Sequence, residues 1–129
     1  MSLTNAFETH TLQYLLTTDS LTRPTAWYIA LFTSDPTDTG SAGTEVSTGT
    51  GYARTAVTFT VTGDTASNSA AVEFPAASGG NWGTVSHIGV MDASSGGNMI
   101  VHSALAVSKA INDGDVFRIP TGDLDITAA

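Results

Sequence analysis

The chain has 129 residues, no cysteine, and twelve acidic against four basic side chains, which gives a formal net charge of −8 at pH 7. This length predicts one domain with one core, and the lack of cysteine excludes disulfides and thiolate metal sites. The bases are few and scattered, so binding to nucleic acid or to an anionic membrane surface is disfavoured, because both need clustered Lys and Arg.

The N-terminal segment predicts one helix, over residues 4–17. Asn5 and Glu8 have the spacing of a capping box, and Pro24 prevents a long continuation. The segment lacks the basic and apolar regions of a signal peptide, and no apolar run in the chain approaches the ~20 residues of a membrane helix. The helix either covers an open face of a sheet or forms an arm, residues 1–20, that docks on a neighbouring subunit. Its apolar positions are Leu3, Phe7, Leu12, Tyr14, Leu15 and Leu16.

Trp27–Thr33 is an apolar run rich in β-forming residues, and it predicts a strand buried on both faces. The following segment, Asp35–Gly51, contains four glycines and many hydroxyl residues and shows no periodicity. It therefore predicts a long loop. Loops of this length in compact domains are usually functional or disordered, so this one is either solvated or ordered against a partner.

The rest of the chain predicts strands separated by turns. Alternating apolar and polar residues predict a half-buried antiparallel strand over Tyr52–Val61. The strongest signal is a hairpin, in which the β-rich runs Thr84–Met91 and Asn98–Val107 flank a loop of small, turn-forming residues. About seven or eight strands at this spacing predict an all-β fold with one N-terminal α-helix. We expect a single-domain antiparallel β-sandwich, jelly-roll-like, over residues 21–129.

Few side chains have the spacing of a metal site. His87 and His102 lie on the two arms of the hairpin and could hold a metal together with Asp92, but zinc needs a more complete ligand set. We interpret both histidines as half-exposed residues of a sheet. Two acidic pairs near turns are interpreted as turn and cap residues rather than as a calcium site. These pairs are Asp113 with Asp115 and Asp123 with Asp125.

The motifs of common enzymes are missing from the chain. It contains neither the nucleophile motif G-x-S-x-G nor the phosphate-binding motif G-x-x-x-x-G-K-[ST]. Trp27 and Trp82 are expected in the core or in a seam rather than as ligand platforms. Only 12% of the residues are charged, so burial against a partner desolvates little charge, which favours an assembly subunit. We predict no enzyme activity, no catalytic residue, no cofactor and no bound metal.

A further pattern runs through most of the chain, over about residues 5–127. Its segments are WYIALFT at 27–33, GYAR at 51–54, ASN at 66–68, VEFP at 72–75, WGTVSHIGVMD at 82–92, GGN at 96–98, Lys109, Gly114-Asp115 and IPTGDL at 119–124. Together these segments resemble a family of small virion structural proteins of tailed bacteriophages. Its members are described as capsid decoration (cement) proteins or as tail-fibre-like proteins.

The resemblance implies a β-rich virion component that works by contact. We expect a capsid decoration protein, made in the host cytoplasm and placed on the outer capsid surface. It would bind and stabilise the shell formed by the major capsid protein of the same phage. The alternative is a tail, tail-fibre or baseplate component that takes part in attachment to the host surface. The chain has no shaft-like repeat and no heptads, which favours decoration over a fibre.

The expected contact surfaces are the N-terminal arm and the long loop. Self-association is also expected, with a trimer at a three-fold axis of the lattice as one form. Neither nucleic acid nor membrane is an expected partner. The residues expected to contact a partner are Leu3, Phe7, Asp35, Thr44 and Val46.

Overall fold

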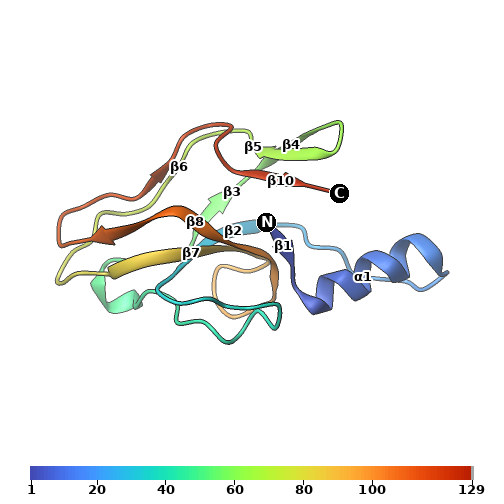
Figure 1. Cartoon of the computed structure of the whole chain (residues 1–129), viewed down its shortest axis with the longest axis horizontal. Coiled ribbons are helices and arrows are strands. Elements are labelled where there is room, and N and C mark those ends of the chain that lie inside the picture. Colours follow the sequence, from blue (N-terminus) through green and yellow to red (C-terminus); the bar gives the residue numbers. More distant parts are fainter. Residues whose placement is uncertain (129) are drawn as a thin grey trace.

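A computed structural model describes residues 1–128 of the chain (Figure 1). The described part contains one α-helix near the N-terminus and antiparallel strands, which confirms the predicted fold class. The strands number ten, more than the predicted seven or eight, because several are only two or three residues long. The elements are β1 Ser2–Leu3, α1 Asn5–Leu16, β2 Trp27–Phe32, the 3-10 helix η1 Thr48–Thr50, β3 Thr55–Val57, β4 Phe59–Thr62, β5 Thr65–Asn68, β6 Val72–Glu73, β7 Gly83–Met91, β8 Met99–Ile111, β9 Arg118–Ile119 and β10 Asp125–Thr127.

The strands form one larger and two smaller sheets. The five-stranded sheet has the order β1-β8-β7-β2-β3, the three-stranded sheet β10-β5-β4, and the two-stranded sheet β6-β9. Figure 1 shows the two smaller sheets on one side of the five-stranded sheet. Val72 of β6 and Ile119 of β9 belong to the same core cluster as Ile29 of β2 and Val85 of β7. The sheets therefore share one hydrophobic core.

Strand β2 is buried on both faces, as its uninterrupted apolar sequence predicts. Ile29 and Leu31 point into the main core. Ala30 and Phe32 alternate with them and pack on the other face, against Met91 and Met99. This second cluster lies under the loop that joins β7 to β8. The central strand thus ties the main core to the hairpin.

Four aromatic side chains fill the end of the core near the 3-10 helix. The ring of Tyr52 stacks on that of Phe74, at a centroid distance of 6.1 Å, and meets Trp82 edge-on at 5.5 Å. Phe74 meets Phe117 edge-on at 5.7 Å. The indole N–H of Trp82 donates to the carbonyl of Thr50 at 2.8 Å, so its one polar atom is satisfied. Trp82 is therefore a core residue, as predicted.

The predicted hairpin is confirmed as β7 and β8, although β8 continues to Ile111, beyond the predicted end at Val107. The pairing is irregular between Val90 and Met91 and, over a longer stretch of β8, between Val85 and His87. Val85 lies opposite Lys109 and His87 opposite Ala104, so Ser86 alone faces residues 105–108. Such a bulge increases the local twist of the hairpin.

The single strand predicted over residues 52–61 is wrong, because the chain changes sheets within it. Val57 ends β3 in the five-stranded sheet, and Phe59 begins β4 in the three-stranded sheet. Thr58 lies between them, and its carbonyl accepts the backbone N–H of Ser69 at 2.9 Å. Apolar and polar residues continue to alternate through Thr58, so the sequence pattern does not indicate the change of sheet. Val61, expected on the buried face, is 70% exposed.

Helix α1 ends at Leu16, close to the predicted end, but its start differs from the prediction. The N-cap is Thr4 rather than Asn5, and no side chain caps the helix. The Thr4 hydroxyl donates instead to the carbonyl of Met99, at 2.7 Å. The predicted capping box with Glu8 is therefore wrong. The competing acceptor comes from β8, which is remote in sequence.

Candidate functional site: the helical arm and its groove

Helix α1 extends away from the sheets, and the chain then returns beside it to enter β2 (Figure 1). None of its residues is buried. It does not cover a sheet face, which was one of the two predicted roles. The remaining prediction is an arm that docks on another molecule. The division into an arm, residues 1–20, and a sheet domain, residues 21–129, stays a prediction, and β1 within the arm pairs with β8.

The root of the arm is fixed to the five-stranded sheet by backbone and side-chain hydrogen bonds. The N–H of Thr4 donates to the carbonyl of Ile100 at 3.0 Å, and that of Asn5 to the carbonyl of Asp38 at 2.9 Å. Thr4 is itself buried. The helix therefore leaves the body from a fixed point, although its far end makes few contacts with the rest of the chain.

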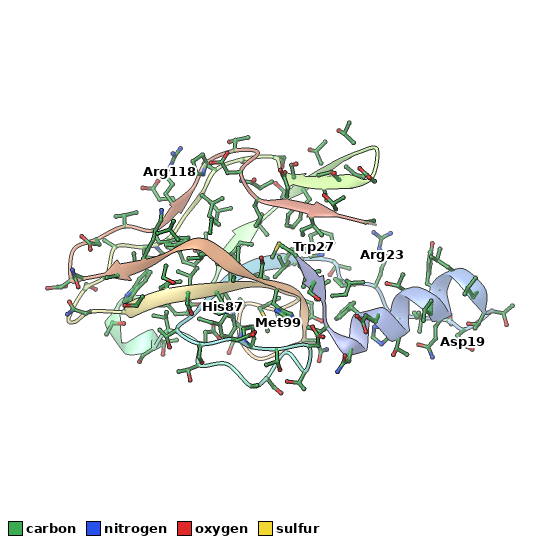
Figure 2. All side chains as sticks on the ribbon, viewed as in Figure 1. Asp19, Arg23, Trp27, His87, Met99 and Arg118 are labelled. Atoms are coloured by element: carbon green, nitrogen blue, oxygen red, sulfur yellow. The ribbon has the colours of Figure 1, made fainter. Side chains whose placement is uncertain are left out.

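One side of α1 faces the returning segment and forms a groove with it. Three adjoining hollows, with volumes between 280 and 460 Å³, share Phe7, Arg23 and Pro24 in their walls. Tyr14 and Leu21 complete the wall of the most apolar hollow. We call these five residues the arm groove. Figure 2 shows Arg23 on the returning segment and Asp19 near the far end of the helix.

Another side of α1 carries a row of exposed residues that lies outside these hollows. Glu8, Leu12 and Leu16 are spaced by four residues, so their side chains lie on one face of the helix. None of them lines the arm groove. Leu12 is 59% and Leu16 77% exposed. We call these three residues the outer ridge. Exposed leucines on a helix that is fixed only at its root are typical of a contact surface.

A second feature, a polar clamp, orders part of the long loop. Arg54 donates two hydrogen bonds to the carboxylate of Glu45, at 2.9 and 2.8 Å, and two more to the carbonyls of Ala93 and Gly96, at 3.0 and 2.7 Å. The hydroxyl of Tyr52 donates to Glu45 at 2.6 Å and accepts the N–H of Leu31 at 3.0 Å. This clamp connects the long loop, β2 and the hairpin loop. No local sequence pattern indicates the clamp, because Ala93 and Gly96 are remote from Arg54 along the chain.

The clamp shifts the pKa of each ionisable group in it. Burial by itself raises the pKa of the Glu45 carboxyl, but hydrogen bonds from Arg54 and Tyr52 and the charge of Arg54 outweigh burial and hold that pKa below its ordinary value. The pKa of the Tyr52 phenol is raised by burial and by its bond to Glu45. The pKa of Arg54 is raised, first by its hydrogen bond to Glu45. The clamp therefore contains an ionised pair and a neutral phenol at neutral pH.

The five predicted contact residues do not form one surface. Phe7 is half-buried in the arm groove, and Asp35 and Thr44 are exposed on the long loop. Leu3 pairs with Val101 in the sheet and packs against the core. Val46 is only 4% exposed and belongs to the core cluster. The side chain of Val46 is thus used in folding, because the loop turns inward where the backbone N–H of Val46 donates to Leu31.

The histidines and acids considered for metal binding are engaged elsewhere. His87 lies opposite Ala104 and His102 opposite Gly89, so the two histidines are not a cross-strand pair. The Nε2 atom of His102 lies 2.8 Å from a carboxylate oxygen of Asp38. Within residues 1–128, no group of three or more His, Asp or Glu side chains has the arrangement of a metal site. Three of the candidate acids accept hydrogen bonds: Asp92 from Asn98, Asp115 from Asn112 and Asp125 from Ser67.

The described chain therefore combines an all-β body with an exposed helical arm and a clamped loop. A family model described as "Podophage GP4 fiber I protein gp80" matches residues 2–127, and the chain belongs to this family. The predicted resemblance to virion structural proteins of tailed phages is therefore confirmed, and the chain is a fibre component of a podophage virion. No curated protein sequence matches the chain.

The family match also bears on the two predicted virion roles. It supports the alternative, a tail-fibre or attachment role, better than the capsid decoration that was expected first. The expectation of decoration was argued from the lack of a repeat or heptad shaft. That argument fails because a fibre can include compact units that are not themselves the shaft. Within residues 1–128, no helix is both long and apolar enough to cross a membrane.

Proposed function

We propose that the chain is a non-enzymatic component of the podophage fibre that takes part in attachment to the host surface. The family match over residues 2–127 carries this proposal. The structure supports it in one respect. The largest apolar side chains that remain exposed are concentrated on α1, which offers a contact surface rather than a reaction site.

Within this proposal, the two exposed regions have different roles. The arm connects the chain to its neighbours in the fibre, through Phe7 and the other exposed apolar residues of α1. The outer part of the long loop, with Asp35 and Thr44, offers a second exposed surface. The clamp of Arg54 on Glu45 holds this loop against the body, so it reaches a partner already ordered, which lowers the entropic cost of binding.

The test is to locate the chain on the virion and to remove it. Gold-labelled antibody against the purified chain should bind the fibres. Particles produced without the chain should have intact heads but adsorb poorly to host cells. Restoring the chain from a plasmid during infection should restore adsorption.

The opposite results would support the capsid decoration role instead. Antibody label over the head shell, together with heads that lose heat resistance when the chain is absent, would contradict the fibre role. Purified chain that binds emptied heads but not fibres would lead to the same conclusion. Particles without the chain that adsorb normally would show that it has no part in attachment.

A further inference from the structure

Helix α1 takes part in two different apolar surfaces, and the charges on them differ in sign. Arg23 lines all three hollows of the arm groove, whereas the acid Asp92 lines only one of them. The outer ridge contains the acid Glu8 beside Leu12 and Leu16. The arm groove contains the base Arg23 beside Phe7 and Pro24. Neither Glu8 nor Arg23 makes an ion pair within residues 1–128. The negative charge of the ridge and the positive charge of the groove are complementary. Within one copy they cannot meet, because the ridge and the groove lie on different sides of the helix.

We propose that the outer ridge of one copy inserts into the arm groove of a second copy. The groove is a concave, mainly apolar wall, with hollows of 280 to 460 Å³. Leucines at positions 12 and 16 form a convex row that can enter it, and Glu8 on the same row then lies toward Arg23. Of the four basic residues of the chain, two others are already engaged: Arg54 bonds Glu45 and Lys109 lies over the ring of Phe117.

The overall charge also favours the arm as the place of contact. Two bodies of net charge −8 repel each other. Over its twelve residues, α1 has one acid and no Lys or Arg, so this repulsion is smallest there. The contact joins two different surfaces, which makes it heterologous, and repeated copies would close into a ring or continue as a filament.

The size of the surface predicts a weak contact. The exposed parts of Leu12, Tyr14, Leu15 and Leu16 amount to on the order of 400 Å² of apolar area. Together with the polar residues around it, the buried area comes to about 1,000 Å², which is the lower limit for a specific interface. Each pairwise contact is therefore reversible in solution, and it gains strength where neighbouring copies are held together in an assembly. This inference concerns the chain alone and does not depend on its place in the virion.

Sedimentation equilibrium of the purified full chain tests the contact. The average mass should rise above that of the 13.2 kDa monomer as concentration increases from about 10 μM to about 1 mM. The variants Glu8→Arg and Arg23→Glu each place like charges together, and each should weaken association about tenfold or more. The double variant Glu8→Arg/Arg23→Glu restores opposite charges and should return association to near the unmodified level.

The Glu8→Arg variant also separates a specific contact from a general charge effect. Glu8→Arg changes the net charge from −8 to −6, because one negative charge becomes one positive charge. If overall repulsion controlled association, this variant would associate more tightly. The proposed contact predicts weaker association. Far-UV circular dichroism of each variant checks that α1 is still formed.

Apolar variants provide the matched control. Leu12→Ser with Leu16→Ser should abolish association, whereas Val107→Ser should leave it unchanged, although Val107 is 72% exposed on β8. A chain that stays monomeric over the whole concentration range overturns the proposal and leaves another virion protein as the occupant of the groove. Failure of the double charge variant to recover association overturns it as well. Neither result bears on whether the chain is found on fibres.

Discussion

Arg54 connects parts of the chain that are remote in sequence, through the carboxylate of Glu45 and the carbonyls of Ala93 and Gly96. Glu45 accepts from both Arg54 and Tyr52 and is largely enclosed. Removing the charge of a partly buried pair leaves its partner without compensation, and this usually costs more than the pair contributes when intact. Removing one partner of the clamp should therefore lower the free energy of unfolding by more than is usual for a partly exposed ion pair.

The lowered pKa of Glu45 predicts a pH-dependent contribution to stability. A carboxyl whose pKa is lower in the folded than in the unfolded state stabilises the fold above its ordinary pKa of 4.5, and this stabilisation is lost as pH falls through the folded pKa. Glu45→Gln should cost about 2 kcal/mol at pH 7. The difference from the unmodified chain should shrink below pH 4.5. Urea unfolding between pH 7 and pH 3 measures it.

The matched control for this variant is Glu73→Gln. Glu73 is exposed on β6 and has the same charge, so this variant reproduces the change in net charge without touching the clamp. It should change the free energy of unfolding by less than about 0.5 kcal/mol. A Glu45→Gln cost that stays constant from pH 7 to pH 3 would mean that the ionised form of Glu45 does not stabilise the fold.

Two glycines with similar backbone angles should differ sharply when replaced. Gly51 has φ of +80°, and a Cβ there would lie 2.9 Å from the carbonyl oxygen of Ala76. Gly63 has φ of +62°, but a Cβ would meet nothing within 4 Å. Gly63→Ala should cost about 1 kcal/mol from the backbone angle alone. Gly51→Ala should cost at least twice that, because the carbonyl must also move.

Urea unfolding of the two alanine variants tests this pair, since both replace a glycine of positive φ in a loop or turn. Equal costs would show that the loop around Gly51 relaxes freely. That result would also weaken the view that the loop is held rigidly against the body before it meets a partner.

At the scale of elements, the hairpin and the central strand were the features that the sequence predicted best. Alternation and small turn residues act locally, so β7 and β8 could be recognised from their own residues. The division at Thr58 could not be predicted, because an alternating pattern does not state which sheet each residue joins. The clamp was missed for a similar reason: Arg54 meets Ala93 and Gly96, which no local pattern connects to it.

The candidate site was predicted only in part. Apolar residues around Phe7 indicated a helix that could act as an arm, and the structure leaves that helix exposed. The groove depends on the returning segment, which brings Arg23 and Pro24 beside Phe7, and the course of that segment has no sequence signal. Val46 shows the opposite error. It was predicted to contact a partner as part of the long loop, but a single valine in a polar loop can equally be the residue that fixes the loop to the core.

The buried hydrogen bond at the root of α1 predicts that the two ends of the helix contribute unequally to the stability of the protein. Thr4→Val removes the buried bond from its hydroxyl to Met99 and should cost about 1–2 kcal/mol. Thr17→Val removes an exposed bond from its hydroxyl to Gln13 and should cost less than about 0.5 kcal/mol. Thermal unfolding followed by far-UV circular dichroism compares them. Equal effects would show that the helix is not anchored through Thr4.

At the scale of the whole molecule, the three sheets depend on one another. Sheets of two or three strands have little stability alone, and the core that they share with the larger sheet supplies what they lack. Asn68 strengthens this connection. Its side chain, almost fully buried at the end of β5, donates to Ala70 and Pro120 and accepts from Leu124.

Asn68→Ala should therefore destabilise the molecule as a whole, by about 2–4 kcal/mol, because it leaves several buried polar groups without partners. In a Trp27→Phe background, Trp82 is the remaining tryptophan. Its fluorescence therefore reports on the core beside the five-stranded sheet, whereas Asn68 belongs to the three-stranded sheet. Urea unfolding followed by Trp82 fluorescence and by circular dichroism should give coincident midpoints, both lowered by Asn68→Ala. Ser67→Ala, at the neighbouring position, should lower neither midpoint appreciably. A circular dichroism midpoint that falls while the Trp82 midpoint stays fixed would mean that the smaller sheets unfold separately, so that the fibre component has two independently folding parts.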